Sequence, residues 1–477
     1  MKMMIIATIA LAWFISSSFS TQQVSREDYH RICRGDWQKK LIEKQKRILS
    51  GNLDDGKYII TIPVLAGLAD MIHGYIAGFV WSMFTDRAFI IHHIEDLDQN
   101  CQQRSIEFGY EPHLIDWSVQ VPITNSVYKC MLPPYGDNSC PSDVTVDGKS
   151  NRLFQQINGG LREMFYYQNI STFPSTTVAE TTKNFIFASN RGITYHIFNN
   201  TFNGPELYSY GLTPETLFPC IFHLLFKPKP DVCNSACQIT ENKMRQIGAN
   251  SSNVLIGVHV RDETSSEAIE HFFCADRLIQ HYKSINKVTR TLVHHLRFTN
   301  LLTHTHSLTH SLTHSPTHLL IPTHNQEVYI LLVTASVPLQ QNMMAKYGAH
   351  LLLPEGEPKK PEDVHSRQDG KSNDEKCEFS KNKDRRAMLD SARDMHLLSL
   401  AETQIVSRDS GFGIVGAMMR PKKNPIVYKM AVTNPPTLRM CDAFLGGDKL
   451  DVFADTCDSC NLYIHFLPCY FHTAFYI

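Results

Sequence analysis

Long apolar runs alternate with a helical pattern near the start of the chain. Residues 57–65 and 87–92 are apolar stretches of strand length, typical of strands buried on both faces in a parallel sheet. Between them, a glycine-containing turn at residues 66–70 leads into residues 71–86, an apolar segment that predicts a long helix. Strand, helix and strand in this order form a βαβ unit, so the pattern predicts an α/β fold.

The second half of the chain repeats this alternation. Its apolar runs predict strands at residues 254–261, 327–335, 350–353, 404–407 and 425–432. Helices are predicted at residues 266–288, 337–346 and 385–402, with an exposed polar loop over residues 355–383. Two successive halves, each with parallel-sheet character, predict a two-lobed architecture.

The length of 477 residues exceeds what one simple core holds, so two domains are expected. We predict a stem or leading segment over residues 21–56, helical near residues 37–48. An N-terminal α/β lobe would follow over residues 57–249, and a C-terminal lobe over residues 250–440. Residues 441–477 form a tail rich in cysteine and aromatic residues.

The N-terminus predicts entry into the secretory pathway. Lys2 precedes an apolar run at residues 3–15, and Ser18-x-Ser20 fits a signal-peptidase site. Residues 1–20 are therefore predicted to be a signal peptide, with an uncleaved signal-anchor as the alternative, in which case the protein would be membrane-bound. The protein would reside in the ER or Golgi lumen or be secreted. Three N-glycosylation sequons agree with this compartment: Asn169, Asn199 and Asn250.

Cysteine content and net charge indicate which covalent bonds, metal sites and partners the protein can have. Thirteen cysteines in a secretory chain predict several disulfides, and the closest pairs are Cys233 with Cys237 and Cys457 with Cys460. A CxxC pair also occurs in zinc and redox sites, but no second CxxC stands at zinc-ribbon spacing, so local disulfides are predicted. A net charge of −1 argues against a nucleic-acid partner, whereas one or two arginines suffice for a compact anion.

A histidine repeat interrupts the C-terminal lobe. Residues 303–324 contain His306, His310, His314 and His318, spaced by four. On a helix this spacing would suit a metal, but the intervening Ser, Thr and Pro form helices poorly. A strict tetrapeptide repeat is typical of translated simple-sequence DNA, so we expect a disordered insertion rather than a metal site.

One candidate for chemistry is the end of the strand at residues 254–261, which closes in His259-Val260-Arg261. Ligands of open α/β sheets bind outside the carboxyl ends of the strands. The guanidinium fork of Arg261 matches two phosphate oxygens there, although a solvated arginine at a strand end is the alternative.

A second candidate is Ser410-Gly411-Phe412-Gly413, which follows a short strand and opens a helix. Backbone amides at a helix start and a serine hydroxyl form a cradle for phosphate, and glycine lets the ligand approach closely. An ordinary helix cap is the alternative. Combined with the H-x-R strand, this segment predicts a site for a nucleoside diphosphate.

Three segments in order, residues 67–91, 256–261 and 394–418, resemble the glycosyltransferases of GT-B fold that use GDP-fucose, namely the α1,2-, α1,6- and protein O-fucosyltransferases. They are similar to that group's glycine turn with helix and strand, its H-x-R strand end, and its aspartate, L-L-S helix and serine-containing turn. The resemblance implies two Rossmann-type lobes with a cleft between them.

The resemblance also implies roles for single residues. Arg261 would hold the β-phosphate of GDP-fucose and stabilise the charge that builds as GDP leaves. His259 would orient nearby groups or contact the nucleotide. Asp394 would accept hydrogen bonds from the guanine edge or position the donor loop. Phosphate oxygens would bind three groups: the Ser410 hydroxyl and the amides of Gly411 and Phe412.

Departures from the group's pattern affect other roles. Asp262 stands where the α1,2 and α1,6 branches have a second arginine, Ala69 where glycine is common, and Met71 where many members have arginine. Asp70 is a candidate donor contact, with a turn cap as the alternative. Glu263 is the candidate general base for the acceptor hydroxyl, with a solvated acidic pair after the strand as the alternative.

The implied activity is transfer of fucose from GDP-fucose to a hydroxyl of a glycan or glycoprotein. The reaction would invert the anomeric carbon by direct displacement and would need no metal or other cofactor. Alternatives are a catalytically inactive, secreted glycan- or protein-binding relative, and a transferase of the same architecture that uses another nucleotide sugar. Acceptor identity is not encoded in these segments.

Overall fold

The computed structural model describes much of the predicted N-terminal lobe and of the predicted C-terminal lobe. It describes residues 32–33, 35–51, 56–63, 67–92, 105–119, 143–146, 149–156, 165–173, 175–189, 196–233, 235–249, 253–260, 271–272, 274–280, 282–283, 327–355, 373–401, 403–407, 410–419 and 426–430. The predicted signal peptide, the histidine repeat, the C-terminal tail, Asn250 and the Cys457–Cys460 pair lie outside these residues. Among the described helices, none combines the length and apolar character needed to cross a membrane.

The leading helix is present as α3 (Asp36–Ser50) and packs on the N-terminal half. Its buried positions, which include Trp37, Leu41 and Ile48, recur at helical spacing. The amide of Gln45 bonds in both directions with strand β2 (Ala88–Ile91): Nε2 donates to the Phe89 carbonyl over 2.7 Å and Oε1 accepts from the Phe89 amide over 2.8 Å. The helix therefore belongs to the core of that half.

The first sheet has the strand order β2-β1-β6-β5-β4. The strands are β1 (Tyr58–Thr61), β2, β6 (Asn184–Ser189), β5 (Lys149–Gln156) and β4 (Asp143–Val146). All neighbours are parallel except the β4–β5 pair, which is antiparallel. The predicted βαβ unit is confirmed, because β1 and β2 pair in parallel and α4 (Leu68–Met83) connects them.

Helix α4 is buried along nearly its whole length against this sheet. It begins at Leu68 with Gly67 as its N-cap, so the predicted turn at residues 66–70 is too long. The apolar pattern did not reveal this because helix starts depend on the cap and not on periodicity. A side chain on Gly74 would place its Cβ 2.0 Å from the Ser189 carbonyl oxygen, so glycine is required for this close approach.

The second sheet is fully parallel and has the order β10-β9-β8-β11-β12. The strands are β8 (Val254–His259), β9 (Val328–Val333), β10 (Leu351–Leu352), β11 (Thr403–Ser407) and β12 (Ile426–Met430). All five coincide with predicted strands. The chain builds outward from β8 in one direction and then continues from β11 in the other, which is the doubly wound arrangement.

The helices of the C-terminal half are α10 (Ser235–Ala249), α12 (Val337–Tyr347), α13 (Asn373–Leu400) and α14 (Gly411–Met418). Helix α13 begins well before the predicted residue 385, so part of the predicted loop at residues 355–383 is helical. Lysine, glutamate and arginine in its first turns favour helix but produce no apolar period. At its other end, Gln404 Nε2 donates to the Leu398 carbonyl over 2.7 Å and so caps the helix.

Smaller elements complete the N-terminal half. They are helices α7 (Thr176–Thr181), α8 (Gly204–Ser209) and α9 (Pro214–Leu225), strands β3 (Tyr110–Pro112) and β7 (Phe226–Pro228), and 3-10 turns η1 (Ile106–Phe108), η2 (His196–Asn199) and η3 (Pro230–Val232).

Two disulfides join described residues. The predicted local bond between Cys233 and Cys237 is confirmed. The bond between Cys33 and Cys220, 187 residues apart, ties the chain just before α3 to helix α9 and was not predictable from the sequence.

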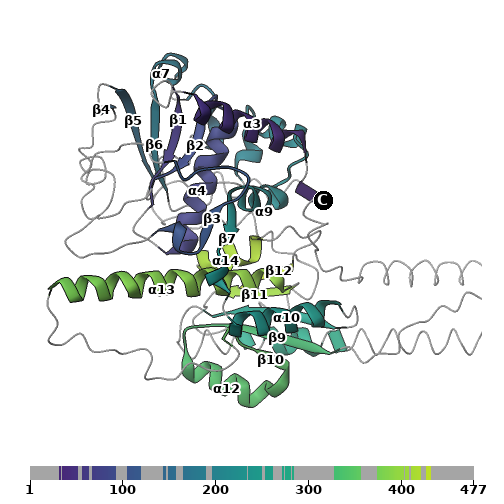
Figure 1. Cartoon of the computed structure of the whole chain (residues 1–477). Helices are drawn as coiled ribbons and strands as arrows, with labels where there is room; N and C mark the ends of the chain where they lie inside the picture. The colour runs from purple at the N-terminus through teal and green to yellow at the C-terminus, as the bar shows by residue number, and fades with distance from the viewer. Residues whose placement is uncertain are drawn as a thin grey trace, which may run out of the picture.

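The α/β class with parallel sheets is thus confirmed. Figure 1 shows the first sheet with α3 and α4 on one side of the molecule and the second sheet with α10 and α12 on the other. Helix α14 packs against α4, and α13 contacts both halves. The exact domain limits and a cleft between the lobes stay predictions.

Candidate functional site

The strand order of the second sheet defines where a ligand would bind. Strands β8 and β11 are parallel neighbours, with His259 opposite Val406. After β8 the chain proceeds to β9 on one side, and after β11 it proceeds to β12 on the other. The connections therefore diverge beyond the carboxyl ends of β8 and β11, which is the switch point at which doubly wound folds bind ligands.

Helix α14 begins at this switch point. Its N-cap, Ser410, is buried, and its hydroxyl accepts a hydrogen bond from the Gly413 amide over 3.3 Å. The Ser410 carbonyl accepts from the Ile414 amide over 3.1 Å. The amides of Gly411 and Phe412 come earlier in the first turn and have no partner within the helix. The predicted helix start is therefore confirmed, and the positive end of the helix dipole faces the switch point.

The imidazole of His259 lies against this helix. It stacks on the ring of Phe412 with 4.9 Å between the ring centroids and 29° between the planes. A Cβ on Gly413 would lie 2.9 Å from His259 Nδ1, so only glycine lets the imidazole pack this closely. His259 and the Ser410–Phe412 turn, predicted independently, are thus brought together.

Two further residues support His259 and were missed in the sequence. The Ser407 hydroxyl, at the end of β11, donates to the His259 carbonyl over 3.4 Å. It also lies 3.5 Å from Nε2 of the fully buried His271. The partners of Ser407 lie 148 and 136 residues away in the sequence, so no local pattern identifies this group.

Asp70 reaches the same place from the N-terminal half. It lies in the first turn of α4, and a Cβ on Gly411 would be 3.1 Å from its Oδ1. Asp70 therefore lies in the first turn of a helix, within residues 66–70 that the sequence predicts as a turn. An acidic residue here faces the start of two helices, α4 and α14.

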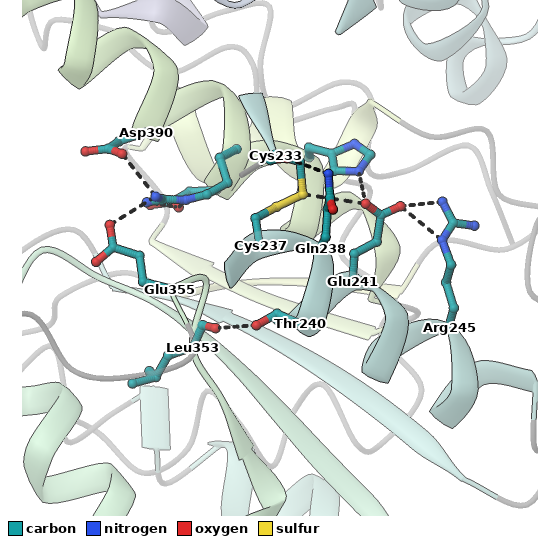
Figure 2. The surroundings of a disulfide bond; sticks show 12 residues. Cys233, Cys237, Gln238, Thr240, Glu241, Arg245, Leu353, Glu355 and Asp390 are labelled. Atoms are coloured by element: carbon teal, nitrogen blue, oxygen red, sulfur yellow. Dashed lines mark hydrogen bonds and ion pairs between the residues drawn. A yellow bond between two sulfur atoms is a disulfide. The ribbon is translucent and has the colours of Figure 1, made fainter. Parts of the chain in front are cut away.

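Asp394 lies on the neighbouring helix α13, and its carboxylate is bound by Arg393. Arg393 Nε donates to Asp394 Oδ1 over 2.8 Å. The same guanidinium pairs with Glu355 and with Asp390, both at 3.0 Å, and Figure 2 shows these two acids on different sides of it. Arg393 is only 4% exposed. Burial lowers its pKa, but Asp394 and Asp390 outweigh burial, so the pKa is raised.

The Arg393 cluster, which Glu355, Asp390 and Asp394 complete, lies toward the C-terminal edge of the second sheet. Glu355 follows β10 beyond its carboxyl end, and it bonds Arg393. Farther along α13, Leu398 packs on the middle of β8, where it would lie 2.8 Å from a Cβ on Gly257. The Arg393–Asp394 part of α13 is therefore displaced toward the edge that bears His259. The contacts that define the position of Asp394 are those with Arg393.

Arg261 and Glu263, the predicted catalytic residues, lie outside the described residues, and so does Asp262. Strand β8 ends at His259, and the amide of the next residue, Val260, donates to the Val333 carbonyl over 3.1 Å. Their roles stay predictions. Within the described part of the chain, no group of three His, Cys, Asp or Glu side chains has a geometry that would hold a metal ion.

Two of the predicted sequons are described. Asn169 is partly exposed, and its Oδ1 accepts hydrogen bonds from the Ser171 amide over 3.1 Å and from the Ser171 hydroxyl over 2.7 Å. Asn199 is exposed. Both belong to the N-terminal half.

Comparisons with known proteins return solved structures alone. No protein-family model matches the chain, and no curated protein matches it. The chain is similar to an Arabidopsis thaliana FUT1 mutant in complex with GDP, at 14% identity and a TM-score of 0.45, covering 83% of this chain and 78% of that one. It is also similar to the NodZ α-1,6-fucosyltransferase soaked with GDP-fucose, at 15% identity and a TM-score of 0.35, covering 76% and 94%. A structure of fucosyltransferase NodZ from Bradyrhizobium is similar at 12% identity and a TM-score of 0.38, covering 76% and 94%. The two NodZ proteins among these are fucosyltransferases.

Proposed function

We propose that this protein is a glycosyltransferase that transfers fucose from GDP-fucose to a hydroxyl of a glycan or glycoprotein in the secretory pathway. The observation that supports it is the meeting of three elements at the switch point: the first turn of α4, the end of β8 and the start of α14. The identity of the donor comes from the sequence resemblance.

The diphosphate of the donor would bind at the start of α14. The amides of Gly411 and Phe412 have no partner within the helix, and the helix dipole adds about 0.3–1 kcal/mol for an anion. Arg261 follows β8 directly after Val260 and would add the fixed positive charge that GDP needs as it leaves. With that charge supplied by the protein, the proposed reaction needs no metal ion.

The nucleobase would bind Asp394. Guanine presents an N1–H and a 2-amino group as adjacent donors, and a carboxylate accepts from both. The stacked rings of His259 and Phe412 would lie between the base and the phosphates and orient the nucleotide.

The proposed chemical step is a single displacement. The acceptor oxygen forms a bond to the anomeric carbon of fucose while the bond from that carbon to the β-phosphate oxygen breaks. The electron pair leaves with GDP, and the hydroxyl proton passes to a general base, for which Glu263 is the candidate. Attack from the opposite face inverts the anomeric carbon.

Binding of GDP, UDP and ADP, measured by calorimetry on the purified glycosylated protein, tests the donor. We expect GDP to bind most tightly. Arg261→Ala should weaken GDP binding about 10–100-fold, because a charge-assisted contact to phosphate is lost. Arg386→Ala, which removes an exposed arginine on α13, is the matched control and should bind GDP as the wild type does.

Activity is tested separately by release of GDP from GDP-fucose, alone and with a panel of glycan acceptors. Turnover supports the transferase, and its loss in Glu263→Gln supports the assigned base. Selective GDP binding without turnover on any acceptor would favour the inactive glycan-binding relative. Equal affinity for GDP, UDP and ADP would refute the GDP-fucose assignment.

A further inference from the structure

Arg393 makes an unusual contact with its own neighbour in the sequence. Adjacent residues on a helix point about 100° apart and do not normally face each other. Nevertheless, Arg393 Nε reaches back to Asp394 Oδ1 over 2.8 Å. Further side chains must hold the guanidinium in this direction.

The holding groups are two further carboxylates. Arg393 Nη1 lies 3.0 Å from Glu355 Oε1 and 3.0 Å from Asp390 Oδ1. Glu355 comes from the segment after β10, whereas Asp390 is one turn earlier on α13. Side chains from two elements therefore fix the orientation of the guanidinium. Because the guanidinium is planar and rigid, its bond to Asp394 then restricts the orientation of that carboxylate. Such burial of a charged group requires pairing of this kind.

The carboxylate that Arg393 fixes lies toward the proposed donor site. Glu355 lies beyond the carboxyl end of β10, the edge at which β8 and β11 also end. The side chain of Asp394 is 20% exposed, so it is accessible while it is held. Helix α13 packs against α14, the helix whose start forms the proposed phosphate cradle.

We propose that Arg393 is a positioning residue that orients the Asp394 carboxylate for the donor's nucleobase and thereby sets the preference for guanine. This inference rests on the proposed function, in which Asp394 binds the base. Two adjacent donors on guanine require both oxygens of the carboxylate in one plane with the base, so a carboxylate that rotates discriminates less. Adenine lacks the 2-amino group and has an acceptor at N1.

The experiment compares the affinities of GDP, IDP, ADP and inorganic pyrophosphate in the full-length protein. IDP lacks the 2-amino group, and pyrophosphate lacks the base. Asp394→Asn should weaken GDP binding about 10–100-fold, because a hydrogen bond to a charged group is lost. Arg393→Lys keeps the charge but loses the fork, and it should reduce the ratio of GDP to ADP affinity about 5–10-fold.

Three further results are expected if Arg393 acts through Asp394. Pyrophosphate affinity should be unchanged in Arg393→Lys. The double variant Arg393→Lys/Asp394→Asn should bind GDP no more weakly than Asp394→Asn alone, since both changes remove one interaction. Arg386→Gln, at an exposed position of the same helix, should keep the full preference for guanine.

The outcomes separate the two proposals. If the wild type prefers GDP and Arg393→Lys keeps that preference, or if the two single losses multiply in the double variant, Arg393 has no positioning role and the proposed function stands. If the wild type does not distinguish GDP from ADP, the proposed function fails and this inference fails with it. Arg393→Gln leaves three partly buried carboxylates without their cation, and where thermal melting shows this variant unfolded, Arg393→Lys decides.

Discussion

The imidazole of His259 and the ring of Phe412 stack at 4.9 Å, which joins the end of β8 to the start of α14. His259 is the last residue of β8, and Phe412 lies in the first turn of α14. The sequence predicts both elements, and the contact between them fixes the geometry of the switch point.

Removing this stack should weaken both stability and nucleotide binding. Phe412→Ala loses an aromatic pair worth about 0.5–1.5 kcal/mol beyond the area it buries. We expect GDP affinity to fall about 3–10-fold, because His259 is then held on one side only. Phe412→Tyr keeps the ring and serves as the control in urea unfolding and calorimetry. Unchanged GDP affinity in Phe412→Ala would show that the stack does not orient the nucleotide.

The close packing of Gly413 against His259 makes this position sensitive to any added side chain. A methyl group there would lie 2.9 Å from both His259 Nδ1 and the Cβ of Val406, and the latter belongs to a buried strand that does not yield easily. Gly413→Ala should therefore destabilise the fold by about 1–3 kcal/mol through overpacking. Gly51→Ala, whose Cβ would meet its nearest atom at 3.6 Å, should change the free energy of unfolding by less than about 0.5 kcal/mol. Equal effects of the two changes in urea unfolding would contradict the described packing.

Much of the fold was predictable because its strands are apolar runs. All five strands of the second sheet and the β1–α4–β2 unit produce continuous buried stretches. Strands β4 and β5 were not predicted, since residues 143–156 are largely polar and contain no such run. The first turns of α13 were missed for the same reason, as charged residues favour helix without a period.

The site was predictable only in its local parts. His259 and Ser410 stand at a strand end and a helix start, which the sequence marks directly. The supporting residues Ser407, His271 and Arg393 act through partners that folding brings together, so composition and spacing hold no signal for them. The approach of Asp70 to Gly411 joins the two halves and is likewise a result of tertiary packing.

The disulfide between Cys33 and Cys220 should contribute substantially to stability. It closes a loop of 187 residues, and the restriction of so long a loop in the unfolded chain stabilises the fold by about 2–5 kcal/mol. The pair Cys33→Ala/Cys220→Ala should lower the unfolding midpoint clearly. Cys233→Ala/Cys237→Ala removes a bond with a separation of 4 and should have a smaller effect. A lower unfolding midpoint for Cys233→Ala/Cys237→Ala than for Cys33→Ala/Cys220→Ala would refute the larger contribution of the long-range disulfide.

The lowered pKa of Glu241 makes the stability of the fold depend on pH between about 4.5 and 2. The hydrogen bond from His396 and, secondarily, the charges of His396 and Arg245 lower the pKa of Glu241 to about 2, against burial that raises it. Since the pKa in the folded protein lies below the ordinary glutamate value of 4.5, this stabilisation is present above pH 4.5 and is lost as the pH falls toward 2. After allowance for solvent screening it amounts to about 1 kcal/mol.

Glu241→Gln should therefore be less stable than the wild type at neutral pH and should lose less stability between pH 4.5 and pH 2. Glu43→Gln, which affects an exposed pair with Lys39 at 4.0 Å, is the control and should follow the wild-type curve. Chemical unfolding across this pH range measures both. Parallel curves for Glu241→Gln and the wild type would show that the ion pair to α13 does not carry the acid transition.

Asp70 places a negative charge beside the proposed phosphate cradle, so its two possible effects have opposite signs. A carboxylate near the start of α14 repels an incoming phosphate, and Asp70→Asn should tighten binding of inorganic pyrophosphate about 2–10-fold at low salt and less at high salt. A donor contact requires the opposite for the complete substrate, because a sugar hydroxyl that donates to Asp70 loses a charged acceptor. We therefore expect Asp70→Asn to bind pyrophosphate more tightly and GDP-fucose more weakly than the wild type. Tighter binding of both ligands would mean that Asp70 only repels the phosphates, and weaker binding of both would mean that the cradle is not at the start of α14.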